Sequence, residues 1–340
     1  MSGGVDSSVA AYLLKKQGYD VTGATLIMWE NSDDTSQIDA KKVAEKIGIN
    51  HITINCVEQF KKYVVEYFID EYKNGRTPNP CIECNKFIKF GYMLDYAQSH
   101  GYDYVATGHY AKIEYDDSLN CHFIKKAEYD SKDQTYVLYG LKKDKLCKIL
   151  MPLWEYSKEE IREIAKKEIG MYIANKPDSM EICFVPDDNY KKFIQEYSDY
   201  VPCPGNFVDK SGNILGRHDG IINFTIGQRK GLGQSFGKPM FVTNIDPHTN
   251  NVILGEKGDE YSSGLIADNT NFFIDFENIL FAQCKTRYSS KHANCKITKL
   301  DSDTVRVEFE QKQRAVTPGQ SVVFYEDDKI LGGGIIKSTF

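Results

Sequence analysis

The spacing of apolar positions changes character once along the chain. In the first 200 residues, short apolar runs of strand length alternate with longer stretches in which apolar residues recur at helical spacing. These patterns predict strands at 21–27, 51–57 and 103–110, and helices at 9–16, 39–47, 58–73 and 157–169. Strands that alternate with helices are typical of a parallel sheet covered on both faces, so an α/β fold is expected for this part.

Beyond about residue 200 the helical spacing disappears. Short runs of alternating apolar and polar residues, such as 304–309 and 320–325, are separated by turns rich in glycine, asparagine and proline. Ser211-Gly212-Asn213 is typical of a hairpin turn, and the residues from 271 onward have the strand pattern of a small β-barrel. We therefore expect an α/β domain at 1–200, a central β-rich domain at 201–270 and a C-terminal β-barrel domain at 271–340.

The composition narrows the class of protein. The net charge is −6 over 340 residues, which excludes a wholly basic nucleic-acid binder, so any contact with RNA would use local basic patches. The sequence has no apolar stretch long enough to span a membrane and no signal peptide ahead of its first loop, so we expect a cytoplasmic protein without a membrane partner. Nine cysteines, an odd number, indicate reduced thiols rather than a secreted disulfide framework.

The first eight residues carry the strongest chemical signal. Gly3 and Gly4 allow a sharp turn, and Ser7 and Ser8 open the first predicted helix, so free N–H groups and the helix dipole converge on an anion cradle. It is not a Walker loop, because no Gly-Lys-Ser/Thr follows. Such a loop normally follows a buried parallel strand, and none precedes Met1, so we expect either a start further upstream or a missing first strand.

Cysteines and a histidine are the next candidates. Cys84 of the Cys81-x-x-Cys84 pair falls near the start of a predicted helix, where the pKa of a thiol is lowered, but the pair alone leaves a redox pair, a metal half-site and coincidence open. Cys183 lies between apolar residues, for which a buried inert thiol is the usual explanation. His109 alone is more often structural, and Asp133 or Ser131 is typical of a helix cap.

Read in chain order, these motifs resemble the tRNA-specific 2-thiouridylases (MnmA/TrmU family) of the ATP-pyrophosphatase superfamily. The motifs are the loop Ser2-Gly3-Gly4-Val5-Asp6-Ser7-Ser8, Thr77-Pro78-Asn79-Pro80, Cys84-Asn85, Ala106-Thr107-Gly108-His109-Tyr110, Lys132-Asp133-Gln134, Asp178-Ser179, Ile182-Cys183-Phe184 and Gly227-Gln228-Arg229-Lys230-Gly231-Leu232-Gly233. The resemblance implies that the domain at 1–200 is an ATP-pyrophosphatase catalytic domain and that the central β-rich domain at 201–270 binds tRNA, with the small β-barrel domain after it. It also implies ATP-dependent 2-thiolation of the wobble uridine in tRNAs for Lys, Glu and Gln.

The same resemblance assigns binding residues. Those implied for ATP are the first loop and two later positions, with Asp6 also holding Mg²⁺: Met1, Ser2, Gly3, Gly4, Val5, Asp6, Ser7, Ser8, Met28 and Gly108. Those implied for the flipped target base are Asn79, Pro80 and Cys81. Those implied for the rest of the tRNA are His109, Lys132, Asp133, Gln134, Arg287, Tyr288 and Gln320. Arg287 and Tyr288 also make physical sense as a phosphate binder beside a stacking ring.

Two mechanisms of sulfur transfer stay open. In the first, implied by the family, Cys183 carries a persulfide and Cys84 attacks it, which leaves a disulfide between them. The second starts from Cys81, which stands where better-known members have aspartate. Three thiolates from Cys81, Cys84 and Cys183 suit a [4Fe–4S] cluster whose fourth iron binds a sulfide. The sulfur donor is a persulfide carrier protein or sulfide itself.

Two other classes of protein compete with this interpretation. An ATP-pyrophosphatase amidating synthetase would share the first loop, but it has no use for three cysteines or a β-rich tail. A non-catalytic RNA-binding protein would not require the phosphate loop. AMP formation that depends on ammonia and not on tRNA would favour the synthetase, and absence of ATP hydrolysis with tRNA and sulfide present would favour the RNA-binding protein.

Overall fold

The computed structural model describes residues 1–29, 34–117, 120–129, 132–176, 182–185 and 189–340. Ser131, Asp178 and Ser179 of the sequence motifs lie outside these residues. The chain forms two compact units, and we describe each by itself. The first contains Met1–Val64, Cys81–Glu181 and Asp328–Ile330, and the second contains Val65–Pro80, Ile182–Asp327 and Leu331–Phe340. Within the described ranges, no helix is both long and apolar enough to cross a bilayer.

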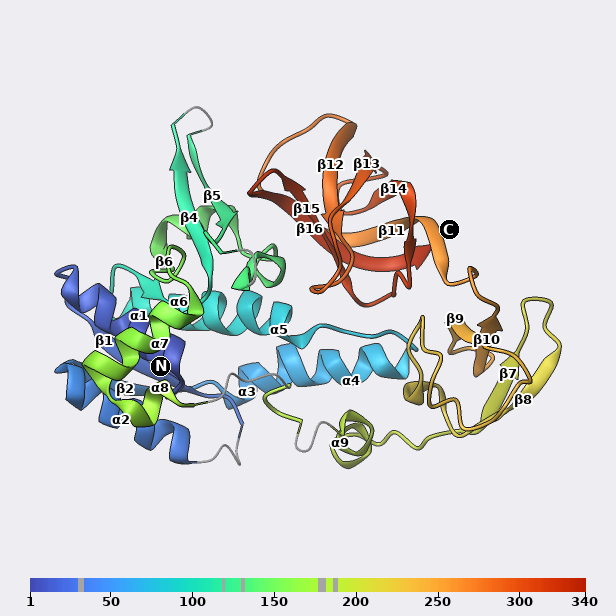
Figure 1. Cartoon of the computed structure of the whole chain (residues 1–340), viewed down its shortest axis with the longest axis horizontal. Coiled ribbons are helices and arrows are strands. Elements are labelled where there is room, and N and C mark those ends of the chain that lie inside the picture. Colours follow the sequence, from blue (N-terminus) through green and yellow to red (C-terminus); the bar gives the residue numbers. More distant parts are fainter. Residues whose placement is uncertain (30–33, 118–119, 130–131, 177–181, 186–188) are drawn as a thin grey trace. The chain divides into compact units, whose positions relative to one another are not determined.

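The first unit opens with the predicted alternation of helices and strands. Its first four elements are α1 (Val5–Lys16), β1 (Thr22–Ile27), α2 (Asp34–Ile47) and β2 (Asn50–Asn55). The two strands are parallel, in register from Thr22 opposite Asn50 to Ile27 opposite Asn55 (Figure 1). This confirms the α/β prediction for the first part of the chain. The helix expected at 39–47 begins earlier, at Asp34.

The middle of the first unit differs more from the expectation. Residues 57–73 are helical as predicted, in three segments: α3 (Val57–Phe60), a π-helical stretch (Lys61–Val65) and α4 (Glu66–Lys73), of which α4 belongs to the second unit. The next helix comprises α5 (Pro80–Glu83), a π-helical stretch (Cys84–Tyr92) and α6 (Met93–Ser99). The strand expected at 103–110 shrinks to β3 (Val105–Ala106), which pairs in parallel with β6 (Ile149–Leu150).

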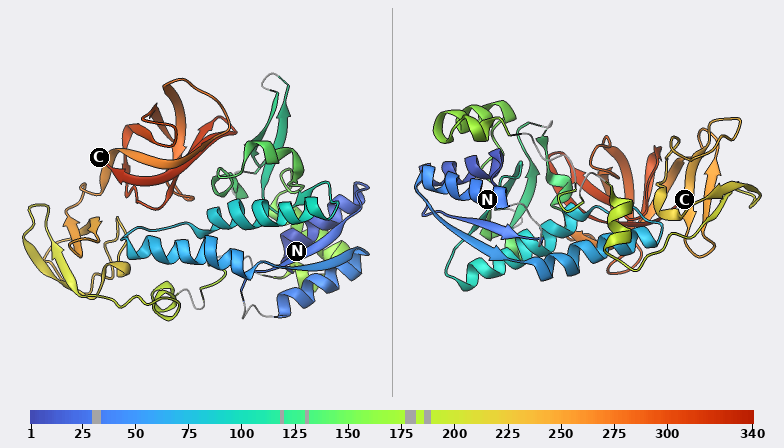
Figure 2. Two further views of the ribbon diagram at one scale, coloured as in Figure 1. Left: turned by 180° about the vertical axis from the view of Figure 1, so that it is seen from behind. Right: turned by 90° about the horizontal axis from the view of Figure 1, so that it is seen from below.

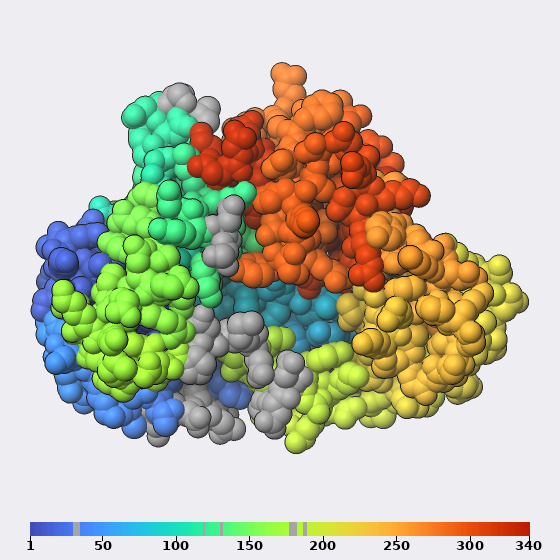
Figure 3. All heavy atoms as spheres, in the orientation of Figure 1, coloured from blue at the N-terminus to red at the C-terminus, as the bar shows by residue number. Residues whose placement is uncertain are grey.

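Three further parts complete the first unit. An antiparallel hairpin, β4 (Ala111–Asp116) and β5 (Cys121–Lys126), was not expected from the sequence. Helix α7 (Lys158–Ile164) begins with the predicted capping box of Ser157 and Glu160. A π-helical stretch (Ala165–Ile169) and α8 (Met171–Ala174) follow it. Figure 3 shows that residues of this helical region (light green) reach the surface on the face drawn. Their inner faces share one hydrophobic core with α1.

The second unit contains two sheets. The smaller one has the strand order β8-β7-β10-β9, in which β7 and β10 are parallel. Its members are β7 (Gly205–Val208), β8 (Ile214–His218), β9 (Phe241–Asp246) and β10 (Asn251–Gly255). The hairpin turn expected at 211–213 joins β7 to β8, and the Asp209 N–H donates to the carbonyl of Asn213 over 2.9 Å. Helix α9 (Tyr190–Glu196) precedes this sheet.

The larger sheet of the second unit is the expected β-barrel. Its strands follow the order β11-β14-β13-β12-β15-β16, and pairing of β11 with β16 closes it (Figure 2). They are β11 (Tyr261–Phe272), β12 (Ile279–Lys285), β13 (Ala293–Lys299), β14 (Val305–Arg314), β15 (Ser321–Glu326) and β16 (Lys329–Thr339). Inward-facing residues such as Ile297, Val307 and Phe324 fill the interior, so the barrel is a packed core.

Candidate functional site

The first loop is built as an anion cradle. Gly3 has the left-handed φ of +67°, and Gly4 is the N-cap residue of α1, whose first N–H groups have no helical partner. The Ser7 hydroxyl accepts from the Ser2 N–H over 3.1 Å, which folds the loop back over the helix start. The buried Ser8 hydroxyl donates to the carbonyl of Gly4 over 2.7 Å. Gly3, Val5 and Ser8 are buried, while Ser2, Gly4, Asp6 and Ser7 are partly or fully exposed and form the surface of the cradle.

At two glycines of the site, neighbouring main-chain atoms leave no room for a side chain. A Cβ at Gly3 would lie 2.7 Å from the carbonyl oxygen of Ser36 in α2. A Cβ at Gly108 would lie 2.8 Å from the carbonyl carbon of Asp6 and 2.9 Å from the Ser7 nitrogen. All three distances are shorter than real Cβ contacts, so only glycine fits at either position without a shift of the main chain. Gly108 follows β3 and lies directly against the start of α1, and the contact with ATP that the resemblance implied stays a prediction.

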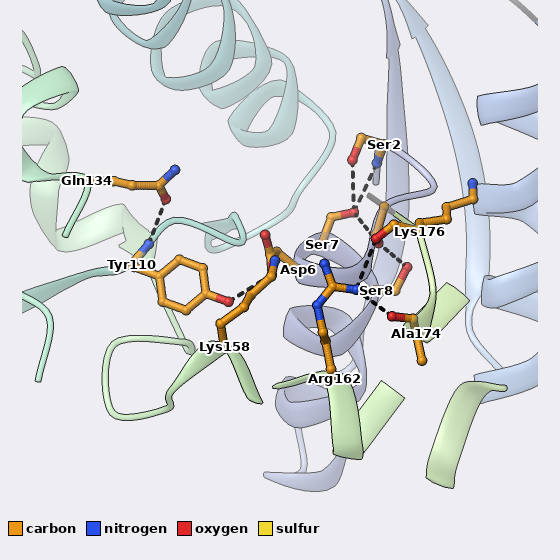
Figure 4. Close-up of polar contacts among 11 residues, drawn as sticks. Ser2, Asp6, Ser7, Ser8, Tyr110, Gln134, Lys158, Arg162, Ala174 and Lys176 are labelled. Carbon is orange, nitrogen blue, oxygen red and sulfur yellow. Dashed lines mark hydrogen bonds and ion pairs between the residues drawn. The ribbon is translucent and has the colours of Figure 1, made fainter. Parts of the chain in front are cut away.

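Asp6 is the charged centre of this loop. Its Oδ1 accepts from the Lys158 ammonium over 2.7 Å and from the Tyr110 hydroxyl over 2.8 Å (Figure 4). The Lys158 side chain is only 8% exposed, so little water screens the ion pair. Gln134 holds Tyr110 in turn, because its Oε1 accepts from the Tyr110 N–H over 3.0 Å. Gln134, assigned to tRNA by the resemblance, supports the phosphate loop in this structure.

The loop has the groups that bind the phosphates of a nucleoside triphosphate. A helix N-terminus, a close-approach glycine and two lysines from later in the chain, Lys158 and Lys176, surround it. Mg²⁺ in such sites takes one or two carboxylates together with phosphate oxygens, and Asp6 supplies one. Met28, the remaining ATP candidate, is half-buried just after β1. The residues present therefore fit the phosphates of ATP, and Mg²⁺ binding by Asp6 stays a prediction.

The groups that fix this loop were not predicted from the sequence. Lys158 and Tyr110 contact Asp6, Lys176 donates to the Gly3 carbonyl, and Arg162 donates to the main-chain carbonyl of Lys176. Tyr110 ends the Ala106–Tyr110 motif, so its place in that motif was a usable signal. Lysine and arginine in helix α7 look like ordinary surface charges in the sequence, and only the fold brings them to the loop.

Cys84 lies in a different environment from the one expected. The helix begins at Pro80, because proline is tolerated in the first turn of a helix. Cys84 therefore lies one turn inside the helix, where its side chain is 7% exposed. Burial raises the pKa of the Cys84 thiol to about 11. The expectation of a lowered pKa at a helix start is wrong for this structure, because loss of solvent outweighs the helix dipole. Cys56, at the end of β2, is also buried and has its pKa raised by burial to about 11.

The thiol of Cys183 is exposed, unlike that of Cys84. A buried thiol was expected, because the neighbouring residues in the sequence are apolar. Those neighbours anchor the segment instead. Phe184 is buried, and its ring lies 5.3 Å from those of Phe68 and Phe193, edge-on and tilted respectively. The Val185 N–H closes a turn by donating to the carbonyl of Ile182 over 3.0 Å. A short anchored turn thus presents a single thiol to solvent.

The proposed iron-sulfur ligands do not form a metal site in the described residues. Cys81 is exposed, Cys84 is buried, and Cys183 belongs to the other unit. In the described part of the chain, no three His, Cys, Asp or Glu side chains are grouped so that they could hold a metal ion. A [4Fe–4S] cluster on these three cysteines therefore stays a prediction.

The difference between the two thiols predicts different reactivity towards iodoacetamide. With a pKa of about 11, only about one Cys84 side chain in a thousand is ionised at pH 8, and the thiolate is the reactive form. We expect Cys84 to be alkylated roughly a hundredfold more slowly than Cys183, with a rate that rises about tenfold per pH unit between pH 8 and 10. Peptide mapping by mass spectrometry measures both rates, and exposed Cys147 is the internal control. Equal labelling of Cys84 and Cys147 at pH 8 would contradict the prediction.

The residues assigned to the target base lie on an anchored segment. Gln320 donates through Nε2 to the carbonyl of Thr77 over 2.8 Å, and the Thr77 N–H donates to the carbonyl of Pro318 over 2.9 Å. These contacts are internal to the second unit and fix the approach to Asn79 and Pro80. Gln320 therefore supports the base-binding segment rather than standing free on the surface.

The remaining tRNA candidates have mixed surroundings. Arg287 donates through Nη2 to the Ala315 carbonyl over 2.6 Å and to the Ile226 carbonyl over 3.2 Å, which ties the glycine-rich loop to the barrel. Tyr288 is 45% exposed, as a stacking ring requires. His109 is buried, and burial lowers its pKa well below the usual value, so the ring is neutral. Lys132 is half-buried, and Asp133 accepts from the Thr135 hydroxyl over 2.7 Å as a local cap.

Comparison with known proteins covers the whole chain. Residues 1–187 match the family described as tRNA methyl transferase HUP domain, residues 191–256 the tRNA methyl transferase PRC-barrel domain, and residues 262–336 the aminomethyltransferase beta-barrel domain. A predicted subunit of tRNA methyltransferase from Methanocaldococcus jannaschii, a solved structure, covers 48% of this chain and 72% of its own at 19% identity and a TM-score of 0.31, which adds nothing to the assignment.

Full-length relatives carry one name. The chain is 51% identical to the tRNA-specific 2-thiouridylase MnmA of Acetivibrio thermocellus, over 99% of this chain and 98% of the relative. It is also 51% identical to the protein of that name from Clostridioides difficile, over 100% of this chain and 97% of the relative. The matched length spans the first loop and both β-rich regions. The chain belongs to the tRNA-specific 2-thiouridylase (MnmA) family.

Proposed function

We propose that this protein is a tRNA-uridine 2-sulfurtransferase that uses ATP to replace the C2 oxygen of a wobble uridine with sulfur. The observation that carries the proposal is the phosphate loop, in which Gly108 lies against the start of α1 and a buried lysine pairs with Asp6. Full-length identity of 51% to 2-thiouridylases supplies the substrate class. By the same likeness, the tRNAs are those for Lys, Glu and Gln.

The first half of the reaction is adenylation. A pyrimidine C2 carbonyl is a poor electrophile, so its oxygen must become part of a leaving group. The uridine oxygen attacks the α-phosphorus of ATP, the α–β phosphoanhydride bond breaks, and pyrophosphate leaves. The N–H groups at the start of α1 bind the phosphates, and Asp6 holds the Mg²⁺ that accompanies them. Lys158 keeps the Asp6 carboxylate from repelling the triphosphate.

The second half is sulfur transfer through two cysteines. The exposed Cys183 thiol takes the outer sulfur from the persulfide of a carrier protein, which is left as a thiol, and so becomes a persulfide itself. Sulfide together with a two-electron oxidant would form the same persulfide. The Cys84 thiolate attacks Sγ of Cys183, which forms a disulfide and releases hydrosulfide, and hydrosulfide displaces AMP from C2. A thiol reductant then restores both thiols. Because burial holds Cys84 protonated here, we propose that binding of tRNA rearranges its surroundings before the attack.

The test is a single-turnover reaction with purified full-length protein, a tRNA transcript for Glu, ATP with Mg²⁺, and a small-molecule persulfide as sulfur donor under anaerobic conditions. We expect AMP and 2-thiouridine in equal amounts, measured by chromatography and mass spectrometry of the digested tRNA. AMP formation with ammonia and without tRNA would identify an amidating synthetase. Absence of both products would leave a non-catalytic RNA-binding protein.

The same preparation distinguishes the two sulfur mechanisms. Iron and acid-labile sulfide are assayed on the active protein and on the Cys81→Ala variant. Iron-free protein that forms 2-thiouridine supports the two-cysteine relay. About four irons per chain, lost in Cys81→Ala together with activity, would replace the relay with a cluster mechanism.

A further inference from the structure

The carbonyl of Gly3 has an unusual partner for a phosphate loop. The ammonium of Lys176 donates to it over 2.8 Å and at the same time pairs with Asp39 of α2 at 2.5 Å. Lys176 lies far from Gly3 in the sequence, with a separation of 173 residues. Its side chain is 31% exposed, so water does not fully screen the contact. One lysine thus connects the turn of the loop to the helix behind it.

This contact fixes the orientation of a peptide group. In a planar trans peptide, the C=O and the following N–H point in opposite directions. With the Gly3 carbonyl directed at Lys176, the Gly4 N–H points away from Lys176 and α2. Gly3 has no Cβ and a φ of +67°, so nothing in its own side chain stops this peptide from flipping. An external contact is therefore needed to hold the N–H in one direction.

Helix α7 fixes Lys176 itself. Arg162 donates through Nη1 to the main-chain carbonyls of Ala174 and, over 3.0 Å, of Lys176. Arg162 follows Lys158 by one helical turn, so both residues lie on the same face of α7. Lys158 reaches the loop at Asp6, and Arg162 reaches it through Lys176. The helix therefore holds the phosphate loop at two points.

We propose that Lys176 is a positioning residue for the nucleotide, which sets the Gly3–Gly4 peptide so that the Gly4 N–H faces the phosphates. The inference rests on the proposed function, because it assumes that the loop binds ATP. Preorganised N–H groups bind without a reorganisation cost, whereas a peptide free to flip loses part of this advantage. Loss of the Lys176 contact weakens the binding of ATP equally in the ground state and in the transition state. Its removal therefore raises KM for ATP and leaves kcat nearly unchanged.

The experiment compares Lys176→Met, Lys176→Arg and the matched control Lys42→Met in the full-length protein. Lys42 also pairs with Asp39, at 3.9 Å, but it is 61% exposed. We expect Lys176→Met to raise KM for ATP roughly tenfold, with kcat and KM for tRNA within about twofold of wild type. Lys176→Arg should recover most of the affinity, because a guanidinium also donates to both oxygens. Lys42→Met should behave as wild type.

An unchanged KM for ATP in Lys176→Met, or an equal rise in Lys42→Met, would overturn the inference. Should Lys176→Met fail to fold in a thermal melt, Arg162→Gln replaces it, since that variant loosens the main chain of Lys176 and keeps its ammonium. A rise in KM for ATP then supports the inference, and an unchanged KM overturns it. Calorimetric binding of ATP to wild type separates the two proposals. If the wild-type protein binds no ATP and makes no 2-thiouridine, the proposed function is refuted. If the wild-type protein is active and Lys176→Met binds ATP as tightly as wild type does, only the role of Lys176 is refuted.

Discussion

Replacing Cys183 by serine is expected to lower the rate of 2-thiouridine formation at least about a thousandfold. The exposed thiol is the proposed acceptor of the persulfide, and a hydroxyl forms no such sulfur bond. Adenylation precedes sulfur transfer and uses the phosphate loop, so release of pyrophosphate on the first turnover should persist. Single-turnover assays that follow pyrophosphate and 2-thiouridine in parallel measure the two steps separately.

Cys203→Ser is the matched control, because Cys203 is also exposed and belongs to the same unit. It should retain full activity and bind tRNA as wild type does. Cys84→Ser should stop thiolation as well, but with a persulfide accumulating on Cys183, which mass spectrometry of the intact protein detects. Wild-type yields of 2-thiouridine from Cys183→Ser would refute the relay through this residue.

The elements that could be predicted from the sequence are those whose cause is local. The spacing of apolar residues sets α1, β1 and β2, and the capping box of Ser157 and Glu160 starts α7 within one turn of the chain. The hairpin turn at 211–213 and the single strands of the barrel follow from the same short-range signals. In each case the residues that determine the structure lie within a few positions of the element itself.

The environment of Cys84 could not be predicted, since it depends on what covers the helix. The sequence predicted that Cys84 lies near the start of its helix, whereas the helix already begins at Pro80. That moves Cys84 inward by one turn, where the surrounding side chains exclude water and raise its pKa. The exposure of Cys183 could not be predicted either. Its apolar neighbours pack against the rest of the unit and anchor the turn, while the thiol itself stays in solvent.

The support of the phosphate loop was hidden for a related reason. Asp6 meets Tyr110 and Lys158 across separations of 104 and 152 residues, and no local pattern marks such pairs. Lys158 also stands at the N-terminus of a helix, where a cation opposes the dipole, and it is buried. A lysine in such an unfavourable place is explained by its partner and not by its own helix. The glycine motifs located the site, and the fold supplied its charges.

Gly108→Ala is expected to reduce ATP-dependent AMP formation about a hundredfold. The new methyl group would lie 2.8 Å from the carbonyl carbon of Asp6 and 2.9 Å from the Ser7 nitrogen, both main-chain atoms at the start of α1. Main chain in a packed helix does not yield cheaply, so the loop shifts relative to its N–H donors, and a displacement near 1 Å costs about this factor. Overpacking should also lower the free energy of unfolding by about 1–3 kcal/mol.

Gly140→Ala separates a local effect on the loop from a general cost of adding a methyl group. Its Cβ would lie no closer than 3.5 Å to any neighbour, an ordinary contact in the same unit. We expect this variant to keep its AMP formation and its melting temperature, while Gly108→Ala loses ATP affinity and retains tRNA binding. Normal AMP formation by Gly108→Ala would show that the nucleotide does not depend on the contact between the end of β3 and α1. In that case the phosphates would have to bind away from the cradle, and the roles of Asp6 and Lys158 would fall with it.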